Sequence, residues 1–480
     1  MHRRRLPFLS LLALVASLGA SVQAQGPTCR EALDSLDVRT RENYAGHLLE
    51  VRGARERDYQ RMLGKARAAA RAIAFEDCFG PLDEYVRWFD DPHLFLFQNV
   101  GADTAGNAER RRTVELRDAN EDAVRRALSR GSHDDIEGIW YDGPLRLAVV
   151  RDSARSRAHF VGLVLTPDTS IWPVGAVRAH FVRREDGQYD ARVLSREFGV
   201  RRTIATVHKR TMLRLSPGIW GKAFPEVAAE RGMLDTVDVH RPATAVRSKS
   251  VVIAIPSHDH AFQSRFAAFV REHGDDIRRT GLLIVDLRGN EGGGSQATAP
   301  LHPWIATRER RVTPYDSGTP MMLSSPAQIR YAKRFTGTDT SAFVRSLVAR
   351  MEARPGALVP LTDVAVVPPP DSVIEGSWRV VMMVDRGTVS AGEVMVLLGL
   401  RSTRAVVVGQ PTAGALDYQS TSIVSLGLAD RRWALGYPTI TAHADLPRRG
   451  MRGKGIAPHV RIDWARIADP IAEVERRFAR

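Results

Sequence analysis

The stretch that decides the fold reads Leu283-Ile284-Val285-Asp286-Leu287-Arg288-Gly289-Asn290-Glu291-Gly292-Gly293-Gly294. It begins with an apolar run, which is typical of a strand buried on both faces of a parallel sheet. The glycines that follow let the backbone approach a ligand closely. Taken alone, the stretch also fits a simple turn, so its meaning depends on the segments around it.

Strand and helix patterns alternate on both sides of this stretch, a rhythm that indicates an α/β fold class. We therefore predict an α/β domain over residues 248–480. The expected strands cover 251–255, 282–287, 379–384 and 405–408, and the expected helices cover 261–272, 391–400 and 468–480.

A second segment, Gly387-Thr388-Val389-Ser390-Ala391-Gly392-Glu393, follows an apolar strand directly and opens a helix. A serine at such a junction can expose its hydroxyl on a tight turn, beside backbone N–H groups that the start of the helix leaves unpaired. Those donors suit a developing oxyanion. A serine at this place also commonly caps the helix, and the segment by itself fits that second interpretation better.

The order of the segments is more specific than any one of them. After the Ser390 segment come Val408-Gly409-Gln410-Pro411-Thr412-Ala413-Gly414 and then Gly453-Lys454-Gly455-Ile456-Ala457-Pro458. In this order the set resembles the tail-specific, or C-terminal processing, serine peptidases, whose relatives include the tricorn core protease and the interphotoreceptor retinoid-binding proteins. The resemblance covers about residues 248–465, with a fainter match near His93.

This resemblance implies a crotonase-like α/β core with Ser390 as the nucleophile. It also implies an oxyanion hole built from the backbone of Ala391 and of a glycine in the Gly292-Gly293 turn. In the processing peptidases the general base is a lysine, and the matching position here is Ala415. A serine-lysine pair is therefore excluded at that site.

The branch of the family similar to tricorn uses a histidine from the N-terminal region, in a pattern that Asp91-Pro92-His93-Leu94-Phe95-Leu96 fits. The resemblance thus implies His93 as general base, and an imidazole with an ordinary pKa of about 6.5 suits that role. Three other residues stay alternatives for it, namely His258, His260 and Lys454.

A serine-histidine pair normally needs a third group that holds the imidazole tautomer. In tricorn-like relatives an acid precedes the Gly453-Lys454-Gly455 turn, where this chain has Met451 and Arg452. Because that carboxylate is missing, no third member is assigned. The acids considered for the role are Asp91, Asp417 and Glu393.

The chain before the α/β domain has two regions with different residue patterns. Apolar residues near helical spacing predict an N-terminal helical region over 25–134. Short β-branched or aromatic runs, separated by Gly, Pro and Asp, predict a β-rich domain over 135–247, either a small barrel or a curled sheet. No segment matches the PDZ module with which processing peptidases capture the C-terminus of a substrate.

Residues 1–24 have the features of a secretory signal: a basic start, an apolar run and small residues before the expected cleavage after Ala24. We therefore expect an exported protein, periplasmic or extracellular, with no membrane-spanning segment after signal removal. Export would leave Cys29 and Cys78 where a disulfide can persist. Their pairing would close a loop of about 50 residues and add about 4 kcal/mol of stability; two buried thiols are the alternative.

The formal net charge is +14, and the basic residues are mostly arginines spread along the whole chain. This distribution is typical of a solvated surface, so we expect no nucleic-acid partner. The histidines are scattered without metal-ligand spacing, and neither a metal nor another cofactor is expected.

These features together predict an exported serine peptidase that cleaves peptide bonds in an extended polypeptide. The first rival is a non-catalytic binding protein on the same scaffold, as the retinoid-binding relatives illustrate. The missing lysine and acid favour this rival, whereas Ser390, the Gly292-Gly293 turn and His93 favour an enzyme. The second rival is an esterase or other small acyl hydrolase, which would use the same groups. The sequence identifies neither the substrate nor the oligomeric state.

Overall fold

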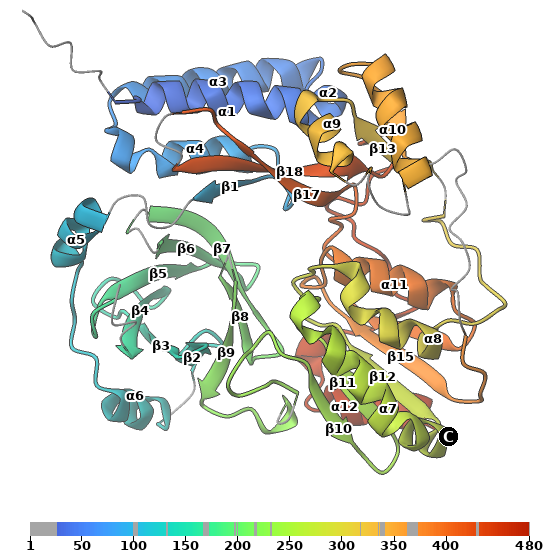
Figure 1. Ribbon diagram of the computed structural model, residues 1–480. Helices are drawn as coiled ribbons and strands as arrows, with labels where there is room; N and C mark the ends of the chain where they lie inside the picture. The colour runs from blue at the N-terminus through green and yellow to red at the C-terminus, as the bar shows by residue number, and fades with distance from the viewer. Residues whose placement is uncertain are drawn as a thin grey trace, which may run out of the picture.

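The computed structural model describes residues 26–479 apart from 99–103, 131–132, 167–171, 196–197, 199, 216–217, 231–232, 317, 335, 337–340, 362–372 and 429–431. Figure 1 shows a helix-covered sheet at the top, a barrel at the lower left and an α/β domain at the lower right. The predicted signal peptide, residues 1–24, lies outside the described residues. In the described part of the chain, no helix combines the length and the apolar character needed to cross a membrane.

A six-stranded sheet forms the centre of the α/β domain, in the order β10-β11-β12-β15-β16-β19. Each neighbouring pair from β11 onward is parallel, and β10 pairs antiparallel with β11 at the edge. The adjacent strands β12 and β15 lead into the two turns that carry Gly292 and Ser390. The strands are β10 (Ala243–Val246), β11 (Val251–Ala254), β12 (Leu282–Asp286), β15 (Arg379–Val384), β16 (Ala405–Gly409) and β19 (Val460–Arg461).

Helices cover both faces of this sheet. On β12, Leu283 and Val285 pack on one face, while Leu282 and Ile284 pack on the other. Because both faces are buried, the strands are continuously apolar instead of alternating. The α/β fold class predicted from that pattern is confirmed. The covering helices are α7 (Gln263–Thr280), α8 (His302–Ile305) and α11 (Ala391–Arg401) on the first face and α12 (Pro470–Phe478) on the second.

A closed barrel precedes the α/β domain, inside the range 135–247 that the sequence predicted to be rich in strands. Its strands pair antiparallel in chain order, and β9 closes on β2. Side chains that include Trp140, Phe160, Phe181 and Trp220 fill one buried cluster, so the barrel has a packed interior. The strands are β2 (Gly138–Asp142), β3 (Leu145–Arg151), β4 (His159–Thr166), β5 (Val177–Arg183), β6 (Tyr189–Leu194), β7 (Val200–His208), β8 (Met212–Leu215) and β9 (Ile219–Phe224), with α5 (Thr104–Thr113) and α6 (Glu121–Leu128) outside.

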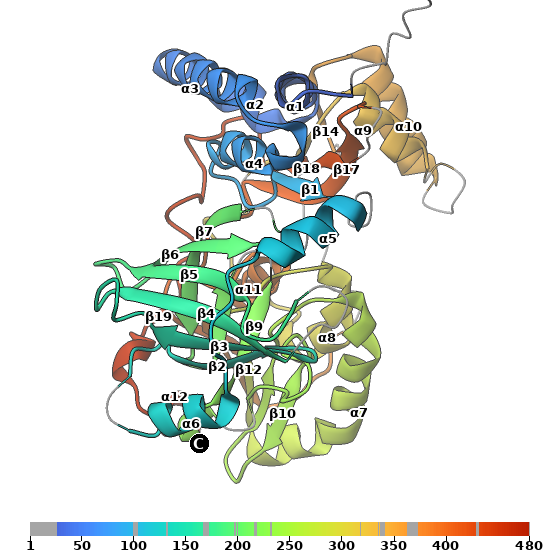
Figure 2. The same ribbon diagram turned by 90° about the vertical axis from the view of Figure 1, so that its left-hand side faces the viewer.

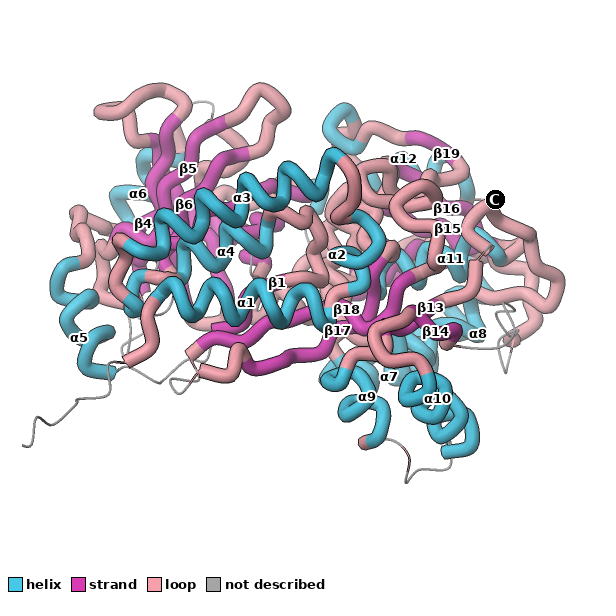
Figure 3. Tube along the Cα trace, turned by 90° about the horizontal axis from the view of Figure 1, so that it is seen from above, coloured by secondary structure: helices cyan, strands magenta, loops and turns pink. Residues whose placement is uncertain are grey.

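The N-terminal helices cover one face of a second sheet, which Figure 2 shows from the side and Figure 3 from above. This five-stranded sheet has the order β1-β18-β13-β14, with β17 also paired to β18. Leu33 from α1 and Tyr44, which lies between α1 and α2, share a core with Leu435 from β18. The elements are α1 (Cys29–Asn43), α2 (Ala45–Glu50), α3 (Ala54–Arg71), α4 (Phe79–Arg87), β1 (Phe95–Gln98), β13 (Met321–Leu323), β14 (Leu358–Pro360), β17 (Tyr418–Ser425) and β18 (Trp433–Thr441), with α9 (Pro326–Lys333) and α10 (Ser341–Ala353) at one end.

This layer joins segments that the sequence assigned to different domains. β1 comes from the predicted helical region, 25–134, whereas its partner β18 comes from the predicted catalytic domain, 248–480. The amphipathic N-terminal helices must bury an apolar face, and strands from the C-terminal half provide the surface on which they do so. The N-terminal helices and strands from the C-terminal half of the chain therefore form one packed unit.

A disulfide fastens the helical layer. Cys29, the first residue of α1, is bonded to Cys78, which lies directly before α4 across a sequence separation of 49. The bond ties the first described helix to the helix that leads toward His93.

Candidate active site

Ser390 lies on a sharp turn between β15 and α11. Its backbone has φ 55° and ψ −117°, a positive φ that is uncommon for a residue with a side chain. Such a conformation costs of order 1–3 kcal/mol and persists only where the surroundings fix it. Here the Val389 N–H donates to the Asn290 carbonyl, 3.0 Å away, and the Ser390 N–H donates to the Glu393 carboxylate, 3.1 Å away. Ser390 also forms a capping box with Glu393 at the start of α11.

Gly292 touches this turn directly. A Cβ placed on Gly292 would lie 2.8 Å from the Cβ of Ser390, and the residue itself has a positive φ of 86°. Only glycine satisfies both conditions without strain. The glycine-rich turn after β12 thus packs against the serine turn after β15.

His93 lies between α4 and β1, and its Nε2 is 2.8 Å from the Ser390 Oγ. The two residues are 297 positions apart in the sequence. Their contact depends on the pairing of β1 with β18, which holds the His93 segment over the α/β domain. In the tautomer with the proton on Nδ1, the serine hydroxyl donates to Nε2.

The His93 backbone is fixed by Asp91. The His93 N–H donates to Asp91 Oδ1, 2.9 Å away, and the Tyr44 hydroxyl donates to Asp91 Oδ2, 2.8 Å away. Burial raises the pKa of Asp91 to about 6, although these hydrogen bonds and Arg452 act against the shift. Asp91 therefore positions the loop through its backbone.

Burial also lowers the pKa of His93, while backbone groups of Tyr418 and Ala415 act in the opposite direction. A lowered pKa keeps the ring neutral near pH 7, so Nε2 can accept a proton. Among the described residues, His93 Nδ1 has no hydrogen-bond partner. The Asp91 carboxylate oxygen lies 4.0 Å from it.

The three predicted oxyanion residues lie around Ser390, but their amides differ. The Gly292 N–H donates to the Asn290 side-chain oxygen, 2.9 Å away, so it is already occupied. No hydrogen bond from the N–H of Ala391 or of Gly293 is found among the described residues. Gly293 is held by His258, whose N–H donates to the Gly292 carbonyl and whose carbonyl accepts from the Gly294 N–H. Of the three amides, those of Ala391 and Gly293 therefore have no acceptor in the part of the chain that the structure describes.

The three alternative bases have other surroundings than the serine. His258 is fully buried beside Asn290, and burial lowers its pKa to about 4. The His260 ring packs over Gly294, and the Lys454 ammonium group donates to the Gly450 carbonyl, 3.3 Å away. In the described part of the chain, no hydrogen bond joins any of these three residues to Ser390.

The carboxylates of Glu393 and Asp417 are occupied elsewhere. Glu393 accepts from the Ser390, Gly414 and Ala415 amides and from the Thr412 hydroxyl. Asp417 accepts from the backbone N–H groups of Met451 and Arg452. Both carboxylates therefore brace loops around the site.

Sequence reasoning missed the partner of Arg452. The guanidinium makes two hydrogen bonds with the buried Glu50, at 2.7 and 3.0 Å, and one with the Phe89 carbonyl, at 3.1 Å. Tyr418 also donates to Glu50, 2.7 Å away. This ion pair joins the loop before the Gly453 turn to the segment that leads into His93. No local pattern announces it, because Glu50 and Arg452 are 402 positions apart.

Sequence reasoning also missed the role of Asp385, which follows β15 directly. Its Oδ1 accepts from the Gly289 N–H at 2.8 Å and from the Gly387 N–H at 2.9 Å. An acid directly after a buried parallel strand was the available signal, since site residues gather at that edge of an α/β sheet. Among the described residues, no group of His, Cys, Asp and Glu side chains is arranged to hold a metal ion.

Known proteins resemble parts or all of the chain. Residues 249–462 match the family model of peptidase family S41. No curated protein sequence matches significantly. Among solved structures, mature CPAF is 12% identical with a TM-score of 0.48, over 93% of this chain and 96% of that one. A lipoprotein from Streptococcus agalactiae is 11% identical with a TM-score of 0.39, over 95% and 98%. The photosystem II D1 C-terminal processing protease is 12% identical with a TM-score of 0.37, over 94% and 97%.

Proposed function

Residues 249–462 form a domain of peptidase family S41, and from that premise we propose that this chain is an exported serine peptidase with Ser390 as nucleophile and His93 as general base. Membership of the family makes the chain a serine-type peptidase with a polypeptide substrate. The 2.8 Å contact between His93 Nε2 and Ser390 Oγ is the observation that carries the residue assignment.

The reaction follows from the geometry. Ser390 Oγ attacks the scissile carbonyl carbon as its proton passes to His93 Nε2. The carbonyl oxygen becomes an oxyanion, and the free amides of Ala391 and Gly293 donate to it. His93 then gives its proton to the leaving amine. A water molecule, deprotonated by the same ring, hydrolyses the acyl-enzyme and restores the serine.

The proposal assigns Gly293 and not Gly292 to the oxyanion hole, because the Gly292 N–H is bonded to Asn290. Gly292 keeps a different task, since its lack of a side chain lets the two turns approach. An Asp91 carboxylate oxygen lies 4.0 Å from Nδ1, and backbone groups of Tyr418 and Ala415 also act on the ring.

Export is part of the proposal. The signal-like residues 1–24 support it, and so does the disulfide between Cys29 and Cys78, since disulfides persist in oxidising compartments. A periplasmic or extracellular site of action would fit both features.

A fluorophosphonate probe tests the assignment on the mature protein, because it reacts only with an activated serine. We expect the wild type to be labelled, Ser390→Ala to be unlabelled and His93→Ala to be labelled far more slowly. Ser425→Ala, on the exposed part of β17, is the matched control and should label like the wild type.

Equal labelling of wild type, Ser390→Ala and His93→Ala would eliminate the catalytic assignment and favour a binding protein on the same scaffold. Full labelling of His93→Ala alone would move the base to another residue. Peptide and small-ester substrates offered to the same variants separate a peptidase from an esterase.

The pH dependence gives a second test. Burial lowers the pKa of His93, so the ring is protonated, and lost as a base, only below the ordinary pKa of about 6.5. We therefore expect kcat/KM to fall on the acid side with an apparent pKa below that value. Asp91→Asn should change this limb little, because burial raises the pKa of Asp91 to about 6 and so neutralises this carboxylate over the same pH range. An inflection above the ordinary pKa would contradict the burial argument.

A further inference from the structure

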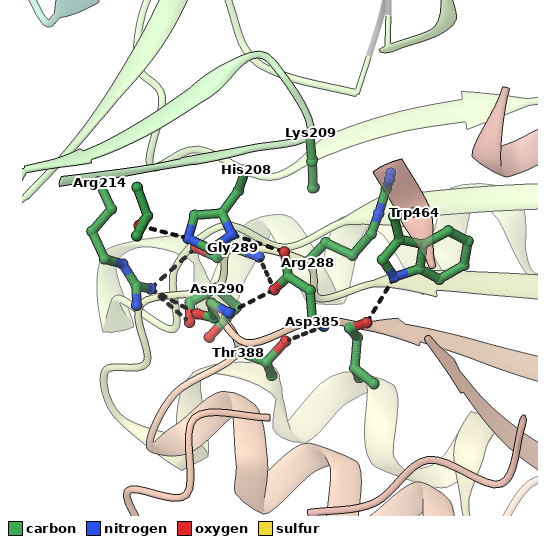
Figure 4. Close-up of polar contacts among 12 residues, drawn as sticks. His208, Lys209, Arg214, Arg288, Gly289, Asn290, Asp385, Thr388 and Trp464 are labelled. Carbon is green, nitrogen blue, oxygen red and sulfur yellow. Dashed lines mark hydrogen bonds and ion pairs between the residues drawn. The ribbon is translucent and has the colours of Figure 1, made fainter. Parts of the chain in front are cut away.

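The β7–β8 hairpin of the barrel reaches the base of the active site. It turns at Lys209 and Arg210, whose φ values of 55° and 58° lie in the left-handed region. A positive φ at two consecutive residues other than glycine strains the backbone, and such strain persists where surrounding contacts hold it. Figure 4 shows His208 and Arg214 pointing from the hairpin toward the turn with Gly289 and toward Asp385.

The hairpin bonds one carboxylate from each of the two central strands. His208 Nδ1 lies 2.9 Å from the Oδ2 of Asp385, which follows β15. The Lys209 ammonium lies 3.0 Å from the Oδ2 of Asp286, the last residue of β12. All four side chains are largely or fully shielded from solvent. Ion pairs in such a place are geometrically specific.

Asp385 links His208 to both catalytic turns through hydrogen bonds. Its other oxygen accepts the N–H of Gly289 at 2.8 Å and of Gly387 at 2.9 Å. Gly289 opens the turn that ends at Gly293, and Gly387 opens the turn that ends at Ser390. One carboxylate therefore sets the spacing of the two turns, and His208 holds that carboxylate. Burial raises the pKa of Asp385, but the His208 imidazole, the Gly289 amide and the Arg288 charge outweigh it and keep that pKa well below its usual range.

Arg214, on β8, bonds the same turns from the barrel side. Its Nη2 donates to the Gly387 carbonyl at 2.7 Å, with longer contacts to the Gly289 and Asn290 carbonyls at 3.5 and 3.4 Å. The fit is close: a Cβ on Gly387 would lie 2.6 Å from the His208 ring and 2.8 Å from the Gly289 Cα. His208 therefore packs against both glycines.

The charges at the hairpin tip are balanced. Asp286 also pairs with Arg288, at 2.8 Å, and Arg288 pairs with Glu230, at 3.1 Å. Two cations, Lys209 and Arg288, therefore face two carboxylates in the buried cluster. A satisfied network of this kind favours one arrangement of its members.

We propose that the barrel contributes to catalysis through His208 of its hairpin. His208 is a positioning residue that, through Asp385, fixes the turn with Gly293 relative to the turn with Ser390. This inference rests on the proposed function, because it concerns the same oxyanion hole. Among the described residues, no hydrogen bond joins the hairpin to Ser390 or His93, so we expect it to act on catalysis through the backbone amides.

The expected effect is on the rate of chemistry. The oxyanion forms only in the transition state, so misplaced amides lower kcat and leave substrate binding nearly unchanged. A shift of about 1 Å in such a group costs about 100-fold in rate. A hairpin that only stabilised the fold would not produce this split between kcat and KM.

The test compares three variants of the full chain in steady-state peptide hydrolysis, with thermal unfolding alongside. We expect His208→Ala to lower kcat by about 10- to 100-fold with KM within about twofold of the wild type. His208→Asn should recover most of kcat, because its side-chain amide can donate to Asp385 as Nδ1 does. His159→Ala, on β4 of the same barrel, should match the wild type.

Wild-type kcat in a folded His208→Ala would overturn the proposal, and so would a rise in KM with kcat unchanged. If His208→Ala does not fold, a folded His208→Asn whose kcat is no higher than that of Asp385→Asn would overturn it equally. Failure of the proposed function looks different, because Ser390→Ala would then keep the wild-type activity.

Discussion

Replacing Ser390 with alanine is expected to lower kcat for peptide hydrolysis by on the order of 10⁶-fold, and replacing His93 to lower it almost as far. The two side chains are joined by one hydrogen bond of 2.8 Å, so neither can act without the other. Without the imidazole the serine keeps its proton, and without the serine the imidazole has no nucleophile to activate. The residual rate in each variant reflects the oxyanion amides and substrate binding alone.

The double variant Ser390→Ala/His93→Ala is the decisive measurement. Residues that act as a unit are strongly non-additive, so the double variant should be no slower than the slower single variant within about threefold. Ser425→Ala, exposed on β17, controls for the loss of a hydroxyl. Losses that multiply in the double variant would show that the two residues act independently, which contradicts the proposed pair.

Replacing Glu393 with alanine should give the largest loss of stability near the site, about 3–5 kcal/mol in the free energy of unfolding. The carboxylate is buried and accepts four hydrogen bonds, from the Ser390, Gly414 and Ala415 amides and the Thr412 hydroxyl. Its removal leaves those donors without partners in a site closed to water. The positive φ of Ser390 loses one of its restraints at the same time.

Urea unfolding with a constant m-value would measure this loss, and kcat should fall with it. Burial raises the pKa of Glu393 and so offsets part of the stability that its hydrogen bonds contribute. Glu272→Ala, an exposed acid of α7, should change stability little and serves as the matched control. A stable Glu393→Ala with an unchanged kcat would show that Gly414 and Ala415 find other acceptors and that the serine turn holds itself.

The sequence predicted the α/β domain well, for a physical reason. Strands such as Val380 to Val384 are buried on both faces, so an unbroken apolar run records their place in the sheet. The turns after β12 and β15 were also visible, because glycine is required wherever two backbones approach as closely as Gly292 approaches Ser390. Short β-branched or aromatic runs and turn residues indicated the strands of residues 135–247 but left a barrel and a curled sheet open, and the structure has a closed barrel.

The parts that the sequence did not reveal are made by long-range contacts. The pairing of β1 with β18 crosses a predicted domain boundary, and neither strand announces its partner. The ion pair of Glu50 with Arg452 and the hydrogen bond of His208 with Asp385 join residues far apart in the chain. The difference between Gly292 and Gly293 depends on where the Asn290 side chain points, which no local pattern records.

The pairing of β1 with β18 also fixes when the enzyme can first work. Residues 95–98 must wait for residues 433–441 before their sheet forms, so a nascent chain holds its histidine away from its serine until the ribosome has nearly finished. Peptidase activity is therefore expected only after strands from the C-terminal half of the chain have paired with the segment that follows His93.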